Sequence, residues 1–550
     1  MYKNLSYPRS VCLRSTLIAA VAALVASTNV MAEQAVPLEA EDLLKLLQEE
    51  GVITEKQAES VRNIARDRLA NESQTSVDHT SVEDKDLPPA SDPDVTRVPY
   101  IPEYLKDEIR DEVRMGLKED VVDDVMTQAK NESWGVPGTN PSWTKRIKFD
   151  GDIRFRYQAD RFDEENSIQY FDFNAINDAG GLAYAGIDGF INTREDRDRL
   201  RLRMRLGMNA KVTQGVSVGM RLATGGTDNP VSTNQTLGGY GNRYAISLDR
   251  AYIKFNSYTN DSILYMGRMP NPWLSTELVW DEDLNFDGIA YSYYFNRSDD
   301  MYDDERKFDP FITFGAFPLQ EVELSSRDKW LLGAQAGFSY LADNQNEFKL
   351  GLSYYHFLHI DGQRNEPDST ANNYTAPPFV QKGNSMYDIS NDTTDPDTQL
   401  FALAAEYQEV NLTALYDFAN LAPVHVILTA DYVVNIGYDE EEVSQRFGEP
   451  RSAQTQGYDL GINVGWPTPY QRGNWNVGLN YRYLERDAVL DAFTDSDFHL
   501  GGTDMQGYKL SFRYGVEENT WLQFRLISSN EIDLEPFSVL TFMADVNARF

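Results

Sequence analysis

Residues 200–208 read LRLRMRLGM, and this stretch decides the fold. Apolar side chains alternate with arginines along it: Leu200, Leu202, Met204, Leu206 and Met208 oppose Arg201, Arg203 and Arg205. Successive side chains of a β-strand point to opposite faces, so such a strand has one apolar and one cationic face. A soluble β-sandwich also alternates, but these charges would then lie in its core at a high free-energy cost. A strand with lipid on one side and a water-filled lumen on the other satisfies both faces.

The same period of two recurs from residue 147 to the last residue. It is clear in 147–157 (IKFDGDIRFRY) and in 508–514 (YKLSFRY). The pattern predicts sixteen strands near 147–158, 198–212, 215–225, 246–257, 262–269, 284–295, 308–317, 329–341, 347–359, 399–414, 423–436, 457–466, 474–485, 505–515, 519–529 and 538–550. An extra hairpin within 410–423 would make eighteen.

The lengths of the connections fit a closed barrel. The longest ones all follow odd-numbered strands: 159–197, 226–245, 270–283, 360–398, 437–456 and 486–504. Connections after even-numbered strands include the tight turns 213–214, 258–261 and 516–518. Long loops on one side and short periplasmic turns on the other are typical of outer-membrane barrels. We therefore expect an all-β fold, a 16-stranded antiparallel transmembrane β-barrel over 147–550.

Residues 1–32 have the three parts of a secretory signal peptide. Three basic residues precede the apolar run TLIAAVAALVA, and Val30-Met31-Ala32 supplies the small residues read at cleavage. The run is too short to span a bilayer as a helix. The only cysteine, Cys12, lies in this segment, so no disulfide is expected in the mature chain. Cleavage would remove three positive and no negative charges, taking the net charge of −36 further from zero. Nucleic acid is not expected as a partner of so acidic a chain, because the like charges repel.

Residues 33–146 have a different, helical pattern. A short periplasmic helical pair is expected in 33–70, with a capping box from Thr54 to Gln57. The polar, Pro-rich residues 71–100 predict a disordered linker. Residues 101–146 predict an amphipathic helix and the lead-in to the barrel, with an apolar residue at every fourth position between Leu105 and Val125. This helix either lies solvated in the periplasm or self-associates into a stalk.

The last strand has the pattern of an assembly signal. Leu540, Phe542, Ala544, Val546, Ala548 and Phe550 share one face, opposite Thr541, Asp545, Asn547 and Arg549. A final strand of this kind that ends in an aromatic residue resembles the signal bound by the barrel-assembly machinery. We assign that role to Phe550.

Basic side chains gather on the inward face of the first four strands. Exposing a guanidinium to lipid near the midplane costs about 2–4 kcal/mol, which places these side chains in the lumen. The expected pore-lining set is Lys148, Arg154, Arg156, Arg201, Arg203, Arg205, Arg221, Arg250 and Lys254. These residues either set ion preference or form structural pairs with Asp150, Asp152 and loop carboxylates.

The third long loop, 270–283, is the candidate constriction. It contains Glu277, Asp281, Glu282 and Asp283. By analogy with sixteen-strand porins, the loop folds inward and faces the arginines. The alternative is that its carboxylates stay outside and bind divalent cations that bridge lipopolysaccharide.

Several segments resemble the putative-porin family of Gram-negative outer-membrane proteins. They are WTKRIKFDGDIRFRY, DRDRLRLRMRLG, the run from LATGGTDNPVSTNQTLGG to LDRAYIKF, MGRMPNPW, LVWDEDLNFDGIAYSY, PVHVILTADYVVN and the helical LLKLLQEEGVITEKQAESV. The resemblance covers most of the mature chain and implies a periplasmic helical extension, a sixteen-strand-like barrel and diffusion of small solutes. It implies no particular substrate.

Other classes of function fit poorly. The five histidines are scattered, and His356 and His359 would point to opposite faces of a strand, so neither catalysis nor a metal site is expected, nor any cofactor. An autotransporter needs a larger passenger, and a TonB-dependent receptor needs a plug domain and more strands. The prediction is a porin for small hydrophilic solutes and ions, expected as a homotrimer in contact with outer-membrane lipid and lipopolysaccharide. The alternative is a plugged structural or adhesive barrel that acts through its long acidic extracellular loops.

Overall fold

The computed structural model describes residues 146–296, 307–323, 325–392 and 397–550. Predictions about the signal peptide, the helical pair, the linker and the amphipathic helix fall on residues outside these ranges. Within the described residues, no helix is long and apolar enough to cross a membrane.

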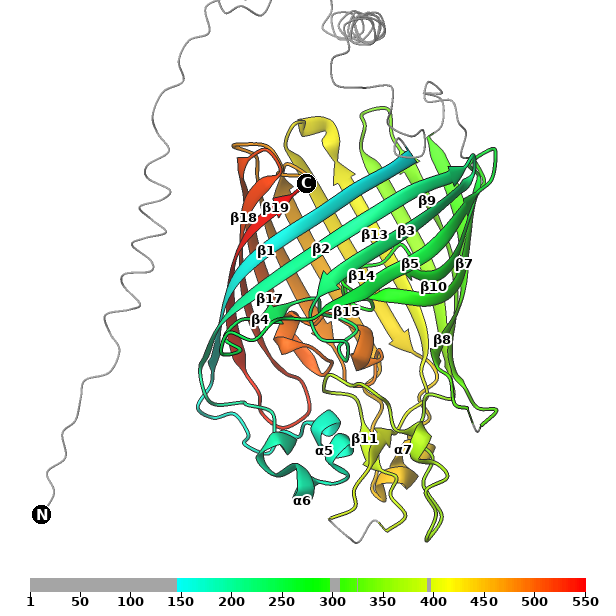
Figure 1. The fold of residues 1–550 in the computed structure, drawn as a ribbon, viewed down its shortest axis with the longest axis vertical. Coiled ribbons are helices and arrows are strands. Elements are labelled where there is room, and N and C mark those ends of the chain that lie inside the picture. The colour runs from blue at the N-terminus through cyan, green and yellow to red at the C-terminus, as the bar shows by residue number, and fades with distance from the viewer. Residues whose placement is uncertain (1–145, 297–306, 324, 393–396) are drawn as a thin grey trace, which may run out of the picture. The chain divides into compact units, whose positions relative to one another are not determined.

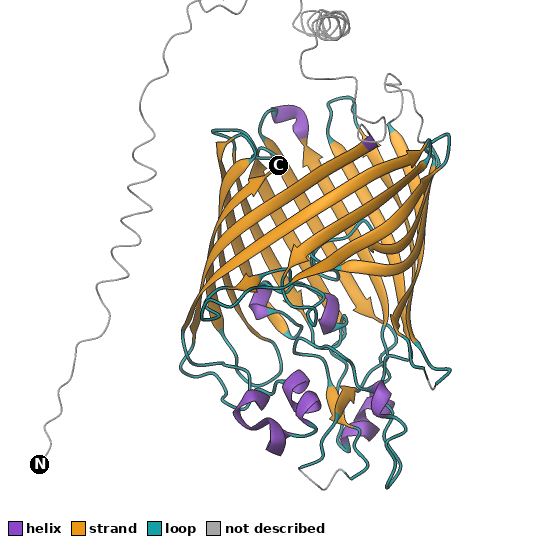
Figure 2. Cartoon of the chain, in the orientation of Figure 1, coloured by secondary structure: helices purple, strands orange, loops and turns teal. Residues whose placement is uncertain are grey.

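The described chain forms a closed barrel of sixteen antiparallel strands (Figures 1 and 2). The strands are β1 (Ile147–Phe162), β2 (Arg197–Thr213), β3 (Val216–Thr224), β5 (Ile246–Asn256), β6 (Ser262–Pro270), β7 (Asn285–Tyr294), β8 (Phe308–Gln320), β9 (Lys329–Leu341), β10 (Glu347–Leu358), β13 (Gln408–Phe418), β14 (His425–Asn435), β15 (Gln456–Gly465), β16 (Trp475–Leu484), β17 (Met505–Glu517), β18 (Thr520–Glu531) and β19 (Val539–Arg549). Each pairs with the next along the chain, and β1 pairs with β19, so the sheet has no free edge. The predicted fold class is confirmed.

One strand lies elsewhere than expected. The tenth strand was expected at 399–414 but spans Gln408–Phe418, because residues Phe401–Leu403 (β12) pair with Met386–Asp388 (β11) inside a loop. The alternative of an extra hairpin in 410–423 is wrong. β13 runs unbroken to Phe418, and a single 3-10 turn, Ala419–Leu421 (η4), leads into β14.

Burial across the wall is the reverse of that in a soluble protein. Leu510 and Val546 are 46% and 48% exposed on the outer face, whereas Arg156 and Asp545 are 0% and 2% exposed on the inner face. This distribution is what alternating lipid-facing and lumen-facing side chains produce.

One rim of the barrel carries short turns and the other carries the long loops (Figure 1); we call them the turn rim and the loop rim. Loop helices α5 (Phe173–Ala179), α6 (Leu182–Ala185) and α7 (Glu440–Phe447) lie at the loop rim. Both α5 and α7 begin at an aspartate that accepts backbone N–H bonds, Asp172 and Asp439, and both end at a left-handed glycine.

Three long loops pack together at the loop rim and reach into the barrel, while β11 lies beyond the rim (Figures 1 and 2). They are L3 (residues 271–284), L5 (359–407) and L7 (485–504). Trp280 of L3, Tyr407 of L5 and Phe498 of L7 are almost fully buried and belong to the largest apolar cluster of the described residues. The lumen therefore contains an ordered core built from loops.

Candidate pore constriction

Loop L3 is fixed to the barrel wall by its tryptophan and its backbone. Gly315 and Gly333 pair directly on β8 and β9, and a Cβ atom at Gly333 would lie 2.6 Å from the Trp273 ring. The two glycines thus leave the space that the indole fills, since any side chain there would displace it. The Leu274 amide donates to Gln335 Oε1 at 2.9 Å, and the Thr276 hydroxyl donates to Asp431 on β14. These contacts hold L3 inside the lumen.

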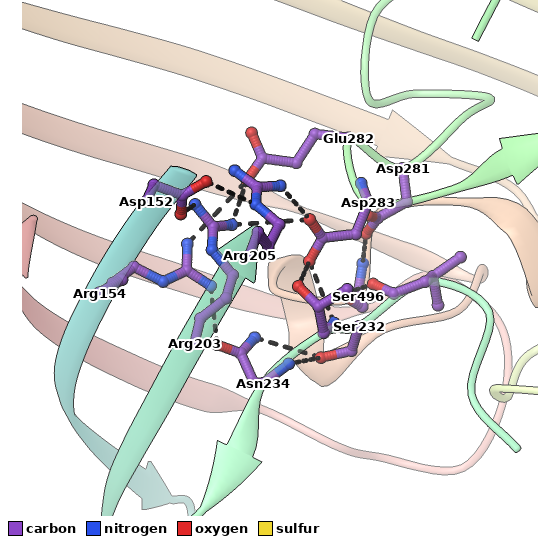
Figure 3. A network of polar contacts seen from close by, with 12 residues as sticks. Asp152, Arg154, Arg203, Arg205, Ser232, Asn234, Asp281, Glu282, Asp283 and Ser496 are labelled. Carbon is purple, nitrogen blue, oxygen red and sulfur yellow. Dashed lines mark hydrogen bonds and ion pairs between the residues drawn. The ribbon is translucent and has the colours of Figure 1, made fainter. Parts of the chain in front are cut away.

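Two carboxylates of L3 face the arginines of β1 and β2 (Figure 3). Asp283 Oδ1 lies 3.0 Å from Arg205 Nη1 and 3.5 Å from Arg203 Nη1. Glu282 Oε1 lies 3.4 Å from Arg203 Nη1, and its distance to Arg154 is 4.0 Å. Burial alone would raise the pKa of Asp283, but Arg203 and Arg205 outweigh it and hold this pKa below its ordinary value.

The other two L3 carboxylates face different partners. Glu277 Oε2 accepts from Lys509 Nζ on β17 at 2.6 Å. Asp281 accepts backbone N–H bonds from Asp283 and from Ser496 of L7. Burial raises the pKa of Asp281 well above its ordinary range, and the nearby Asp283 adds to this effect. Only Glu282 and Asp283 therefore contact the arginine wall.

The predicted basic residues lie along the inner side of β1, β2, β3 and β5. Arg203 and Arg205 also pair with Asp152 of β1, and Arg221 pairs with Asp249. The remaining contacts of the set are Arg154 to Asn234, Arg156 to Asp497 and Asp545, Arg201 to Gln158, Arg250 to Asn285, and Lys254 over the Tyr265 ring, while Lys148 is exposed near the turn rim. Most of these arginines thus have a structural partner.

A register shift at Asp249 explains why both it and Arg250 face inward. Arg221 is opposite Arg250 while the next residue, Leu222, is opposite Leu248, so Asp249 is the extra residue of a bulge. Such a bulge changes which face the following side chains take.

A second set of charged contacts, not predicted from the sequence, involves L7. Asp495 Oδ2 lies 3.0 Å from Arg482 Nη1, which belongs to β16. Asp497 lies 3.0 Å from Arg156 Nη1 and 2.8 Å from Arg525 Nη1 of β18. The inward positions of Arg482, Lys509 and Arg525 follow from the period of two. Nothing local in 485–504 indicates that L7 enters the lumen.

A cavity of about 620 Å³ lies on the turn side of L3. Thr276, Glu277 and Glu282 form its L3 boundary. Its charged lining comprises nine basic and five acidic side chains: Arg154, Arg203, Arg205, Arg221, Arg482, Lys509, Arg513, Arg525 and Arg549 against Asp150, Asp152, Glu277, Glu282 and Asp459. The cavity wall is therefore net positive in a chain whose overall charge is −36.

The described residues contain no group of three His, Cys, Asp or Glu side chains placed to hold a metal ion. The site is a charged cavity in the lumen, bounded by an inward-folded loop, and its fixed charges would act on any ion that enters it. A closed sixteen-strand antiparallel barrel with such an interior and an inward third loop is an outer-membrane porin.

The chain belongs to the family described as Putative porin, whose model matches residues 38–550. No curated protein matches the sequence. The family and the fold favour a channel.

Three solved structures are similar to the chain. The high-pH structure of Pseudomonas putida OprB is 11% identical and covers 76% of this chain and 97% of its own, with a TM-score of 0.43. The outer membrane channel DcaP of Acinetobacter baumannii is 12% identical, with coverages of 74% and 97% and a TM-score of 0.37. The anion-selective porin from Comamonas acidovorans is 10% identical, with coverages of 74% and 99% and a TM-score of 0.38.

Proposed function

We propose that this porin lets small hydrophilic solutes and ions diffuse passively, with a mild preference for anions at its narrowest part. The observation that carries the proposal is the excess of nine basic over five acidic side chains around the turn-side cavity. Fixed charges act over about 8–10 Å at physiological ionic strength. A permeating ion therefore responds to this wall more than to the acidic charge elsewhere in the chain.

The membrane arrangement is part of the proposal. The loop rim faces the cell exterior, the turn rim faces the periplasm, and residues 33–146 extend into the periplasm. We also propose that the barrel-assembly machinery inserts the chain through its last strand, that lipopolysaccharide surrounds the outer half, and that three copies associate. Supporting this orientation, the longest connections, 163–196, 225–245, 359–407, 436–455 and 485–504, all lie on the loop rim, and the tight turns 214–215 and 257–261 lie on the other.

A second candidate function is a plugged structural or adhesive barrel. Loops L3, L5 and L7 favour it, because they share one buried apolar cluster and because L3 and L7 form ion pairs with the inner wall.

Conductance and reversal potential in planar lipid bilayers, with a KCl gradient, distinguish the two candidates. A porin of the proposed kind gives stepwise ohmic currents. The sign of its reversal potential indicates that anions permeate more readily than cations. Protein that is folded, as judged by heat-modifiable mobility in SDS, yet gives no current would establish the plugged barrel. Steady currents with a strongly cationic reversal potential would refute the anion preference but leave the channel itself intact.

A further inference from the structure

The turn-side cavity contains two arginines that pair with no carboxylate among the described residues. Seven of the nine basic residues in its lining have a carboxylate oxygen within 4.0 Å: Arg154, Arg203, Arg205, Arg221, Arg482, Lys509 and Arg525. The other two, Arg513 of β17 and Arg549 of β19, are exposed. A guanidinium of this kind is open to a soluble anion, because no ion pair has to break first.

Arg513 is accompanied by a neutral donor. It is the direct register partner of Gln523 on β18, and both residues line the cavity. Gln523 is half-buried, and neither side chain forms a hydrogen bond with a described residue. The guanidinium offers two parallel N–H donors and the amide offers a further one. A carboxylate matches this set, since its two oxygens fit the guanidinium fork.

Trp521 of β18 lies between the two arginines. Its register partners are Gly515 on β17 and Asn547 on β19. Arg513 and Arg549 are each two residues away from one of these partners, which makes them diagonal neighbours of Trp521 on its two sides. Diagonal neighbours are about 7–8 Å apart, within reach of aromatic and long side chains. A molecule that lies against Trp521 can therefore approach either cation.

The turn between β15 and β16 adds a second ring. This turn folds over the end of the β17–β18 hairpin, where the Asn519 amide donates to the Tyr470 carbonyl oxygen at 2.7 Å. A Cβ atom at Gly515 would clash with the Gln471 carbonyl oxygen, so the close approach requires glycine there. The rings of Tyr470 and Trp521 have centroids 4.9 Å apart, and both residues line the cavity and are half-buried. Together they form an accessible aromatic surface.

The charge beside these rings is positive. The guanidinium carbon of Arg549 lies 5.6 Å from the centre of the Tyr470 ring. Asp152, the register partner of Arg549 on β1, already pairs with two arginines of β2. The hairpin carboxylates Glu517 and Glu518 are exposed and do not line the cavity. An anion at the rings therefore meets cations that the lining carboxylates have not neutralised.

We propose that the turn-side cavity holds a binding site for aromatic carboxylates. The carboxylate accepts hydrogen bonds from Arg513 and Gln523. The ring lies against Trp521 and Tyr470, and Arg549 adds positive potential. The inference rests on the proposed anion pathway, because the ligand has to enter the lumen, and it names aromatic acids as the organic anions that this pathway retains.

Calorimetry on the full-length protein in zwitterionic lipid nanodiscs, with empty nanodiscs as the blank, tests the site. The probes are benzoate, cyclohexanecarboxylate and benzyl alcohol, which have similar sizes and differ in aromaticity or charge. We expect saturable binding of benzoate, about three- to tenfold weaker binding of cyclohexanecarboxylate, and no saturable binding of benzyl alcohol. Cyclohexanecarboxylate that binds as tightly as benzoate would overturn the role of the rings, and benzyl alcohol that does so would overturn the role of the charge.

Three variants locate the site. Arg513→Gln should weaken benzoate at least tenfold, as expected for hydrogen bonds to a charged group. Trp521→Leu should weaken benzoate about three- to tenfold and hardly change cyclohexanecarboxylate, so that the two acids bind alike. Arg472→Gln is the matched control, because it removes an exposed cation of the β15–β16 turn that does not line the cavity, and it should change neither affinity by more than about twofold. Benzoate binding that Arg513→Gln leaves unchanged in folded protein would refute the site.

Planar-bilayer recordings in KCl separate a failure of this site from a failure of the proposed function. A wild-type channel that conducts with an anion preference but binds no benzoate would refute the site alone. Benzoate binding that depends on Arg513, in protein that passes no current, would refute the pore and retain the site.

Discussion

Arg156 and Asp545 form a doubly hydrogen-bonded ion pair across the seam that joins the first strand to the last. Arg156 Nε donates to Asp545 Oδ1 at 2.8 Å and Nη2 donates to Oδ2 at 3.1 Å, and the two residues are direct register partners. Asp497 and Arg525 complete a closed square, since each of the two arginines contacts each of the two aspartates. The seam and loop L7 are thus held by one neutral set of four charges.

Asp545→Asn should destabilise the barrel by about 3–5 kcal/mol, because it keeps the shape but leaves an excess positive charge in a buried set. The measurement is the free energy of unfolding in urea from lipid vesicles. The control is Asp198→Asn, which breaks the exposed Arg161–Asp198 pair, 41% and 52% exposed, and should cost less than about 1 kcal/mol. Equal losses of unfolding free energy for the two changes would show that the buried seam pair stabilises the barrel no more than an exposed surface pair does.

The contact between Gly151 and Phe550 helps to close the barrel, and substitutions at either residue should impair this closure. Their backbones exchange two hydrogen bonds, at 2.9 and 3.0 Å, and a Cβ atom at Gly151 would lie 2.5 Å from the Phe550 ring. Gly151→Val should displace the ring, and Phe550→Asp should place a charge on the lipid face, so both should lower the amount of folded protein in the outer membrane severalfold. Phe550→Tyr should assemble normally. Normal outer-membrane levels of Phe550→Asp in fractionated cells would contradict the assembly role.

Asp497 should keep L7 in place in acid. Burial would raise the pKa of this carboxyl, but Arg156 and Arg525 hold it well below its ordinary value. A depressed carboxyl pKa stabilises the fold above the unfolded value of about 4, and this stabilisation is lost only as the pH falls through the folded value. The Asp497 contact itself should therefore persist at pH 4. Asp497→Asn should raise the single-channel current noise above that of the wild type by a similar factor at pH 7 and at pH 4. Asp188→Asn, at an exposed position of the first loop, should not raise it. An effect of Asp497→Asn that disappears at pH 4 would argue against the anchor.

Lys382 links L5 to L7 and should make this contact stronger at alkaline pH. Its Nζ donates to the carbonyl oxygens of His499 and Gly501, and burial lowers its pKa to about 7. The unfolded loop keeps the proton up to about pH 10.5, so stability rises with pH between the two values and is constant below the lower one. Hydrogen exchange in residues 382–385 and 499–503, corrected for intrinsic rates, should slow between pH 7 and pH 9 by a larger factor in the wild type than in Lys382→Met. The variant keeps the other titratable groups of this region, Asp491 and Glu531, so the difference between the two proteins isolates Lys382. An equal pH dependence in the two would refute the assignment.

The local alternation of apolar and polar residues was enough to predict the strands of the barrel wall. It was not enough to predict the loops that pack inside the barrel. Strand β2 was predictable because three arginines cannot face lipid, and the same logic places Arg482 and Arg525 inside. The start of β13 was mispredicted because Phe401–Leu403 has the composition of a strand and pairs within L5 instead. The partners of Arg156 could not be predicted, since Asp497 is brought to it by long-range packing of L7. Within L3, spacing identified four carboxylates, but only the fold separates Glu282 and Asp283 from Asp281, which faces L7.

Substitutions of two arginines of β2 should affect ion selectivity and pore width differently. Arg201 has a hydrogen bond to Gln158 but no carboxylate within 4.0 Å among the described residues, whereas Arg205 holds Asp283 of L3. Arg201→Gln should therefore shift the reversal potential in a salt gradient toward cations at unchanged conductance.

Arg205→Gln should produce a similar shift together with a larger and noisier conductance, because it releases one anchor of L3. Changing Arg201, Arg203 and Arg205 together to Gln should give the largest shift, while Arg327→Gln, at an exposed position in a loop, should give none. Glu282 and Asp283 oppose the arginines electrostatically, so the wild-type preference should be small. A wild-type pore that is already strongly cation-selective, and that the triple change leaves unmoved, would assign selectivity to the acidic loops instead of the arginine wall.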